Sequence, residues 1–318
     1  MKTDRNFWFG CAAVLLFGLA TQTHAETIAV ITDLNGSYGS TRYHARVDAA
    51  VAAIVGLQPD VVLSAGDMVA GQRRPLLSRD QVRAMWASFH SHVTDPLAAA
   101  GIPLAVTPGN HDGSAYPGFA AEREIFVDEW GARRPDVEFV AADAYPLNYA
   151  VAVGKVLVIG LDVTTVSPLP AVQREFLEAV LSRHGKRFDT RIVFCHLPLW
   201  PFARGRENEI LRDSEFAAQL AALDVDALVS GHHHVFYPGV DDTGVLHVSA
   251  GVLGGNSRRF TGSDLKSEFS FVVIEIDNGA VTVSARAAPD FQRRVDVLSL
   301  PPQITGPGGR LRRFEPGG

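Results

Sequence analysis

Cysteine is scarce in this sequence, which has only Cys11 and Cys195 among its 318 residues. Cys11 lies in an N-terminal segment that we expect to be removed, so no intrachain disulfide can form in the mature chain. Cys195 ends the apolar run Ile192-Val193-Phe194, where a buried, unreactive thiol is more common than a nucleophile. Because 47% of the residues are hydrophobic, the chain has enough material for a globular core without disulfides.

Concentrated positive charge is also lacking. The 29 basic and 35 acidic residues give a formal net charge of −6, and no segment gathers Lys and Arg as a nucleic-acid-binding face would. We therefore expect no nucleic-acid partner. The composition does not determine the oligomeric state.

No apolar run is long enough to cross a bilayer, which takes about 18 or more residues. The longest N-terminal run, Phe7 to Ala20, follows Lys2 and Arg5 and precedes the small residues of Thr23-His24-Ala25. This pattern predicts that residues 1–25 are a signal peptide cleaved after Ala25. The mature protein would then be periplasmic or secreted, with no membrane span; the alternative is an uncleaved anchor.

From Thr27 onward, short apolar runs alternate with longer helical patterns, which predicts an α/β sheet domain over residues 26–290. Two predicted hairpins, 147–161 and 269–286, make the sheet mixed. No internal repeat is visible, and residues 291–318, whose last part from Pro301 is rich in Pro, Gly and Arg, are expected to form a mobile tail. The predicted strands cover 27–32, 61–65, 104–107, 147–153, 156–161, 191–195, 227–230, 245–249, 269–276 and 280–286, with helices near 171–181 and 208–223.

Five polar clusters each follow a predicted strand. They are Asp33-Leu34-Asn35, Gly66-Asp67, Gly109-Asn110-His111-Asp112, His196, and Gly231-His232-His233-His234. Ligands of open α/β sheets bind at the carboxyl ends of the strands, so these clusters can converge on one place. Carboxylate, imidazole and amide groups suit divalent transition metals. A single cluster could equally be a helix cap, a turn or a core histidine, but the five together favour a metal site.

This ordered set resembles the calcineurin-like metallophosphoesterase family, whose pattern is Asp-x-His, Gly-Asp, Gly-Asn-His-Asp/Glu, His and Gly-His-x-His. The resemblance covers most of the mature chain, and the third and fifth clusters carry it most specifically. It implies a four-layer α/β/β/α sandwich of two mixed β-sheets flanked by helices. It also implies two divalent or mixed-valence metal ions, with manganese, iron and zinc not distinguished by these ligands.

The resemblance further implies a role for each residue. Asp67 would bridge the two metals, Asp33 and His234 would complete the first site, and Asn110, His196 and His232 would complete the second. His233 would point elsewhere. His111 would stand beside the substrate, stabilising charge or protonating the leaving oxygen, and Asp112 would orient His111.

The first cluster departs from the family pattern, because Asn35 stands where His is usual. Purple acid phosphatases also lack that His but place a Tyr three residues after the Gly-Asp aspartate, where this chain has Ala70. Asn35 could bind metal through its amide oxygen or cap the turn at Gly36, and Tyr38 is near enough in sequence to substitute. Arg258 and Arg259 could reach a substrate phosphate, but we expect a solvated surface pair.

The function implied is that of an exported phosphoesterase acting on a small phosphorylated substrate. It would hydrolyse phosphomonoesters or phosphodiesters by in-line attack of a metal-bridging hydroxide. The alternative is a catalytically impaired metal-binding module that keeps the phosphoesterase fold.

Overall fold

The computed structural model describes residues 25–315 of the chain. The predicted signal peptide lies outside this range, apart from Ala25. None of the helices within the range combines the length and the hydropathy that a bilayer-spanning segment needs.

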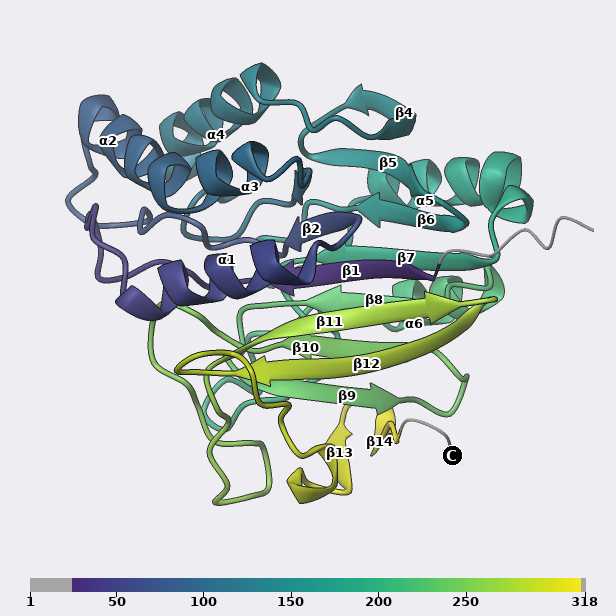
Figure 1. Cartoon of the computed structure of the whole chain (residues 1–318). Coiled ribbons are helices and arrows are strands. Elements are labelled where there is room, and N and C mark those ends of the chain that lie inside the picture. Colours follow the sequence, from purple (N-terminus) through teal and green to yellow (C-terminus); the bar gives the residue numbers. More distant parts are fainter. Residues whose placement is uncertain (1–24, 316–318) are drawn as a thin grey trace, which may run out of the picture.

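Two β-sheets form the centre of the molecule (Figure 1). In the smaller sheet, β1, β2 and β3 run parallel, β11 runs antiparallel to β1, and β12 runs antiparallel to β11. Its spatial order is β12 (Ala280–Ala287), β11 (Ser270–Asp277), β1 (Glu26–Ile31), β2 (Val61–Ser64) and β3 (Leu104–Val106).

The larger sheet has nine strands and is also mixed. Its central strands β6, β7, β8 and β10 are parallel, and antiparallel strands flank them on both sides. The spatial order is β13 (Gln303–Gly306), β14 (Gly309–Arg313), β9 (Phe236–Val240), β10 (Leu246–Ala250), β8 (Ala227–Ser230), β7 (Thr190–Cys195), β6 (Val156–Gly160), β5 (Asn148–Val153) and β4 (Glu138–Ala144).

Helices cover the outer face of each sheet, which gives the four-layer α/β/β/α sandwich that the family resemblance implies. The smaller sheet is covered by α1 (Ala45–Leu57), α2 (Arg79–Phe89), α3 (Asp95–Ala99) and α4 (Ala120–Ala132). The larger sheet is covered by α5 (Ala171–His184) and α6 (Ser214–Ala222). Short helical turns occur at His90–Thr94, Pro117–Phe119, Gly185–Arg187 and Val297–Ser299.

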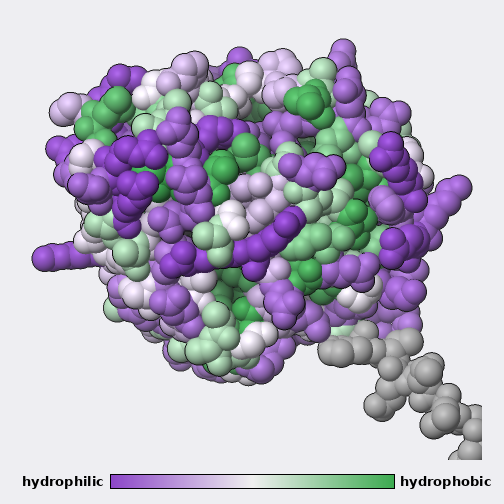
Figure 2. Space-filling model, turned by 90° about the horizontal axis from the view of Figure 1, so that it is seen from above, coloured by the Kyte–Doolittle hydropathy of each residue, from purple (hydrophilic) through white to green (hydrophobic). Residues whose placement is uncertain are grey.

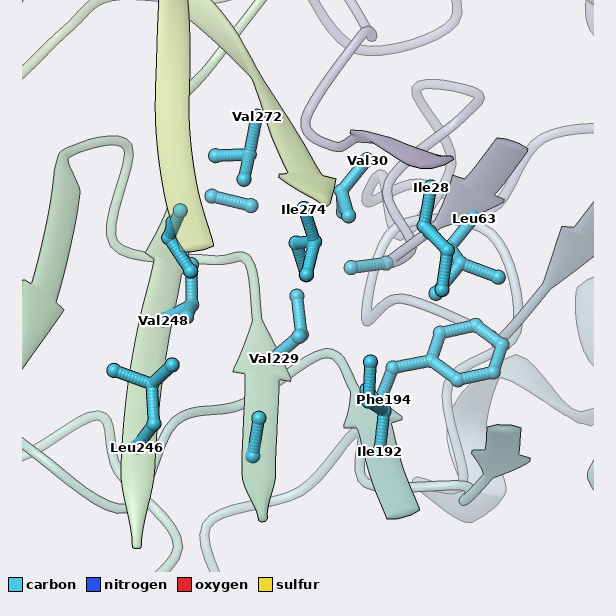
Figure 3. Close-up of a cluster of buried hydrophobic side chains, with 14 of the residues drawn as sticks. Ile28, Val30, Leu63, Ile192, Phe194, Val229, Leu246, Val248, Val272 and Ile274 are labelled. Carbon is cyan, nitrogen blue, oxygen red and sulfur yellow. The ribbon is translucent and has the colours of Figure 1, made fainter. Parts of the chain in front are cut away.

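The layers follow from the alternation of side chains along buried strands. In β1, Ile28 and Val30 face the other sheet, whereas Ala29 and Ile31 face the helices. In β7, Ile192 and Phe194 point between the sheets in the same way (Figure 3). Strands buried on both faces read as continuous apolar runs, which is why the sequence marks them clearly.

Large hydrophobic side chains at the surface come from separate parts of the fold. On the face seen from above, hydrophilic residues cover much of the surface and hydrophobic ones lie among them (Figure 2). Such scattered exposure is ordinary for a protein surface in contact with water. The larger exposed ones are Tyr38, Leu76, Tyr116, Val166, Val172, Leu265 and Leu298.

Two sequence-based expectations are wrong. The helix expected near 208–223 begins only at Ser214, because the Asp213 carboxylate accepts a hydrogen bond from Phe216 N (2.9 Å) and caps it there. The C-terminal segment is not a mobile tail up to residue 315: it forms the β13–β14 hairpin, and β14 pairs with β9. The apolar residues of the two hairpin strands, Ile304 and Leu311, are buried in the core between the sheets.

Candidate metal centre

The five polar clusters follow β1, β2, β3, β7 and β8, so strand ends of both sheets contribute to one place. Backbone hydrogen bonds join the loops: Asp33 N donates to Gly66 O (3.1 Å), and Gly231 N donates to His196 O (3.0 Å). The clusters therefore lie on a rigid frame between the two sheets rather than on independent loops.

Asp33 and His234 form one side of the site. Thr32 Oγ1 and His232 N both donate to Asp33 Oδ2 at 2.9 Å. His234 Nδ1 lies 2.8 Å from the carbonyl of Asn256, so Nδ1 carries the proton and Nε2 presents a lone pair. That Nε2 lies 3.0 Å from Asp33 Oδ1, a buried oxygen that accepts no hydrogen bond. A nitrogen lone pair and an orphaned carboxylate oxygen thus face each other.

His196, Asn110 and Asp67 form the other side. His196 Nδ1 lies 2.7 Å from the carbonyl of Ala65, so Nδ1 donates to it and Nε2 is the ring atom left to bind a metal. This Nε2 lies 3.0 Å from Asn110 Oδ1 and 3.4 Å from Asp67 Oδ1. The Asn110 amide nitrogen donates to Gln72 Oε1 (2.8 Å), which directs Oδ1 inward.

His232 completes this second side. Asp67, His196 and His232 each offer one possible ligand atom, and these three atoms lie within 4.8 Å of one another. The His232 Nε2 atom lies 3.0 Å from Glu209 Oε2, which leaves Nδ1 as the available ligand atom. Both sides therefore gather carboxylate, amide and imidazole groups whose oxygen and nitrogen atoms can bind metal, and this set fits divalent cations.

The charges of the site depend on one another. Burial alone would raise the pKa of Asp67, but the charges of His196 and His111 outweigh it and hold this pKa well below its usual value. Burial lowers the pKa of His196, but the charge of Asp67 outweighs that effect and raises it to about 9. A cation bound by His196 must therefore displace a proton, so metal affinity will weaken at low pH.

Several of the candidate ligand residues adopt the left-handed backbone conformation that few residues other than glycine adopt. The φ angles of Asp33, Asp67, His232 and His234 are 52°, 55°, 64° and 55°. Each such residue costs on the order of 1 kcal/mol, and such strain is concentrated at functional sites. The turns need close packing as well, because a Cβ at Gly109 would lie 2.1 Å from Asp67 N.

His111 lies beside Asp67 but belongs to neither group of candidate ligands. Its Nδ1 donates to Gly71 O (3.1 Å), and its Nε2 lies 3.9 Å from Asp67 Oδ2. The ring packs against Tyr38, with 5.1 Å between the ring centroids. Tyr38 therefore belongs to the surroundings of His111.

The expected role of Asp112 is wrong, because Asp112 does not hold the His111 ring. Its carboxylate accepts hydrogen bonds from Met68 N (2.6 Å) and Gly109 N (2.5 Å). Burial, aided by the charge of Asp67, raises the pKa of Asp112 to about 7. Asp112 therefore ties the loop after β2 to the loop after β3, and the Gly71 carbonyl orients His111 instead.

The sequence left the role of Asn35 open and predicted that His233 would point away from the site. Asn35 lines the cavity of the site, and its Nδ2 lies 3.4 Å from Val69 O. His233 points away from the site, as expected, and is fully buried; burial lowers its pKa to about 3.

Three charged residues near the site were not found or not assigned from the sequence. Glu209 contacts His232 from a segment that was expected to be helical. It does not follow a predicted strand, so no sequence pattern singled it out. Arg206 forms an ion pair with Glu209. Arg258 was expected to be solvated, but it is only partly exposed and its Nη1 donates to His232 O (2.7 Å). Arg259 is exposed, as expected.

The site opens into a cavity of about 580 Å³. Its walls carry ligand residues together with His111 and two arginines. The lining residues are Asn35, Gly36, Ser37, Tyr38, Asp67, Gln72, Asn110, His111, Arg206, Glu209, His232, His234, Gly255, Asn256 and Arg258.

The sequence matches the family model described as calcineurin-like phosphoesterase over residues 26–236. No curated protein matches the chain.

Solved structures, two of them of proteins named as phosphatases, share the fold. A purple acid phosphatase from yellow lupin (Lupinus luteus) seeds is similar with a TM-score of 0.64 and 16% identity, over 85% of this chain and 53% of that one. PhoD is similar with a TM-score of 0.60 and 12% identity, over 90% and 73%. A dimetal phosphatase from Danio rerio has a TM-score of 0.51 and 15% identity, over 81% and 98%. This chain thus spans about half the length of the lupin protein.

Proposed function

Because this chain belongs to the calcineurin-like phosphoesterase family, we propose that it hydrolyses a small phosphomonoester or phosphodiester with two bound divalent cations. The observation that carries the proposal is the pairing of acceptors on both sides of the site. His234 Nε2 faces the orphaned Asp33 Oδ1, and His196 Nε2 faces the oxygens of Asn110 and Asp67.

The residues divide naturally between two cations. Asp33 and His234 would hold one, Asn110, His196 and His232 would hold the other, and Asp67 would serve both. Manganese, iron and zinc all suit these donors. When bound, the cations would place positive charge beside the phosphate oxygens and activate a water molecule for attack.

His111 is the residue placed to act on the leaving group. Because Nδ1 donates to the Gly71 carbonyl, the ring is held with Nε2 on the side of Asp67 and the cavity. A proton at Nε2 can form a hydrogen bond with the leaving oxygen and then pass to it. A site that only stored metal would have no use for this arrangement, so His111 favours an enzyme over a binding module.

Arg258 is placed to bind the substrate phosphate. It lines the cavity, and in the described part of the chain it forms an ion pair with no carboxylate. Burial is the largest influence on the pKa of Arg258 and lowers it, because the surrounding protein keeps solvent away from the guanidinium charge. An anion in the cavity would supply the missing partner.

The proposal is tested by the release of nitrophenol from mono- and bis-nitrophenyl phosphate by the full chain. We expect release that requires manganese, iron or zinc and stops when a chelator removes the metal. The preferred substrate separates a monoesterase from a diesterase. Failure to hydrolyse either compound with any of the three metals would contradict the proposal.

Replacing Arg258 is expected to weaken substrate binding more than turnover. Charge-assisted hydrogen bonds contribute about 1.5–3 kcal/mol, so KM in Arg258→Gln should rise about tenfold or more. Inhibition by inorganic phosphate should weaken in parallel. The matched control is Arg259→Gln, because Arg259 is exposed and its Nε donates to Asp264 O (3.0 Å). Equal kinetics for the two variants would show that Arg258 binds no phosphate.

A further inference from the structure

The middle histidine of the Gly231-His232-His233-His234 sequence connects the metal centre to a neighbouring loop. His233 Nδ1 accepts hydrogen bonds from Phe202 N (3.0 Å) and Ala203 N (3.3 Å). Its Nε2 donates to the backbone carbonyl of Glu209 (3.0 Å). Backbone amides only donate and carbonyls only accept, so His233 has a single consistent tautomer. His233 thus anchors both ends of the segment 202–209 beside the ligand turn.

The anchored segment places the Glu209 carboxylate against a ligand residue. Glu209 Oε2 lies 3.0 Å from His232 Nε2, and Glu209 Oε1 is bound by Arg206. The carboxylate accepts, so Nε2 of His232 carries the proton and Nδ1 keeps its lone pair. Only 14% of the His232 side chain is exposed, compared with 35% for Glu209. Glu209 lines the cavity, and its hydrogen bond to Nε2 holds the His232 ring in one orientation.

We propose that Glu209 is a positioning residue for metal binding, which orients His232 and selects the tautomer whose Nδ1 can bind the second cation. This inference rests on the proposed metal-dependent function. A carboxylate behind a ligating imidazole fixes its tautomer and raises its basicity. The pair with Arg206 keeps Glu209 extended towards His232, and the anchor at His233 keeps its backbone in place.

The test is calorimetric titration of the chelator-treated full chain with Zn²⁺. We compare the wild type with Glu209→Ala and Glu209→Gln, and with Glu207→Ala as the matched control. Glu207 is exposed on the same segment, where its carboxylate accepts from Gly205 N (3.0 Å). Thermal unfolding of each variant before the titration confirms that it is folded.

The expected result is a loss of about 10–100-fold in the affinity of one of two Zn²⁺ sites in Glu209→Ala. Glu209→Gln should be closer to the wild type, because an amide oxygen still accepts from His232 Nε2. Glu207→Ala should match the wild type. Unchanged affinity in folded Glu209→Ala, or equal losses in the Gln and Ala variants, would overturn the role of Glu209. A wild type that binds no Zn²⁺ would instead contradict the proposed function.

Discussion

Replacing Asp67 by alanine should remove bound metal and abolish hydrolysis. Asp67 is buried at the junction of the two sides, with Oδ1 3.4 Å from His196 Nε2 and Oδ2 3.9 Å from His111 Nε2. It is the one carboxylate that both proposed cations would share. Bound metal ions typically contribute several kcal/mol to this kind of catalysis, so the rate should fall by about 10³-fold or more. Elemental analysis after dialysis and initial-rate measurements check both effects.

Two further variants make the Asp67 result specific. Asp67 Oδ1 also accepts from His111 N (2.8 Å), so Asp67→Ala could disturb the turn itself. Asp67→Asn keeps the shape of the side chain and should still lose metal, because a neutral amide is a weaker ligand. Asp128→Ala, which removes an exposed carboxylate on α4, should retain metal and activity. Two bound metals in Asp67→Asn and Asp67→Ala would disprove the bridging role.

Replacing His111 by alanine should separate catalysis from metal binding. His111 faces the cavity but lies outside the group of acceptors, so the metal content should equal that of the wild type. Loss of a positioned acid or base typically costs about 10²–10⁴-fold, and we expect kcat to fall within this range. Steady-state kinetics and elemental analysis of the same preparation provide the measurement.

The matched control for His111→Ala is a histidine that lies outside the cavity. His184→Ala removes a histidine from α5, outside the cavity, and should change neither quantity. A rate within a few-fold of the wild type in His111→Ala would exclude the leaving-group role. A loss of metal in this variant would show instead that His111 supports the ligands.

The groups of candidate ligands could be predicted because each follows a strand that the sequence marks plainly. The alternate burial of Ile28 and Val30 on one face and Ala29 and Ile31 on the other makes β1 a continuous apolar run. The carboxyl ends of parallel strands share an edge of the sheet, so Asp33 and Asp67 were expected together. The structure brings together these two residues, Asn110, His196, His232 and His234.

Residues that act through loops could not be predicted in this way. Glu209 reaches His232 from a segment that His233 anchors, and no periodicity of the sequence reveals these contacts. Asp112 follows His111 in sequence, yet its carboxylate bonds to the amide of Met68, far away in the chain. The Pro- and Gly-rich composition after Pro301 suggested a tail, because hairpin turns and mobile segments share these residues.

The most direct test of the central claim is the metal content of the purified full chain, equilibrated with Zn²⁺ or Mn²⁺ and freed of unbound ions. Acceptors from Asp33 and His234 on one side, and from Asn110, His196 and His232 on the other, predict close to two ions per chain. One ion or none per chain would contradict the two-cation centre.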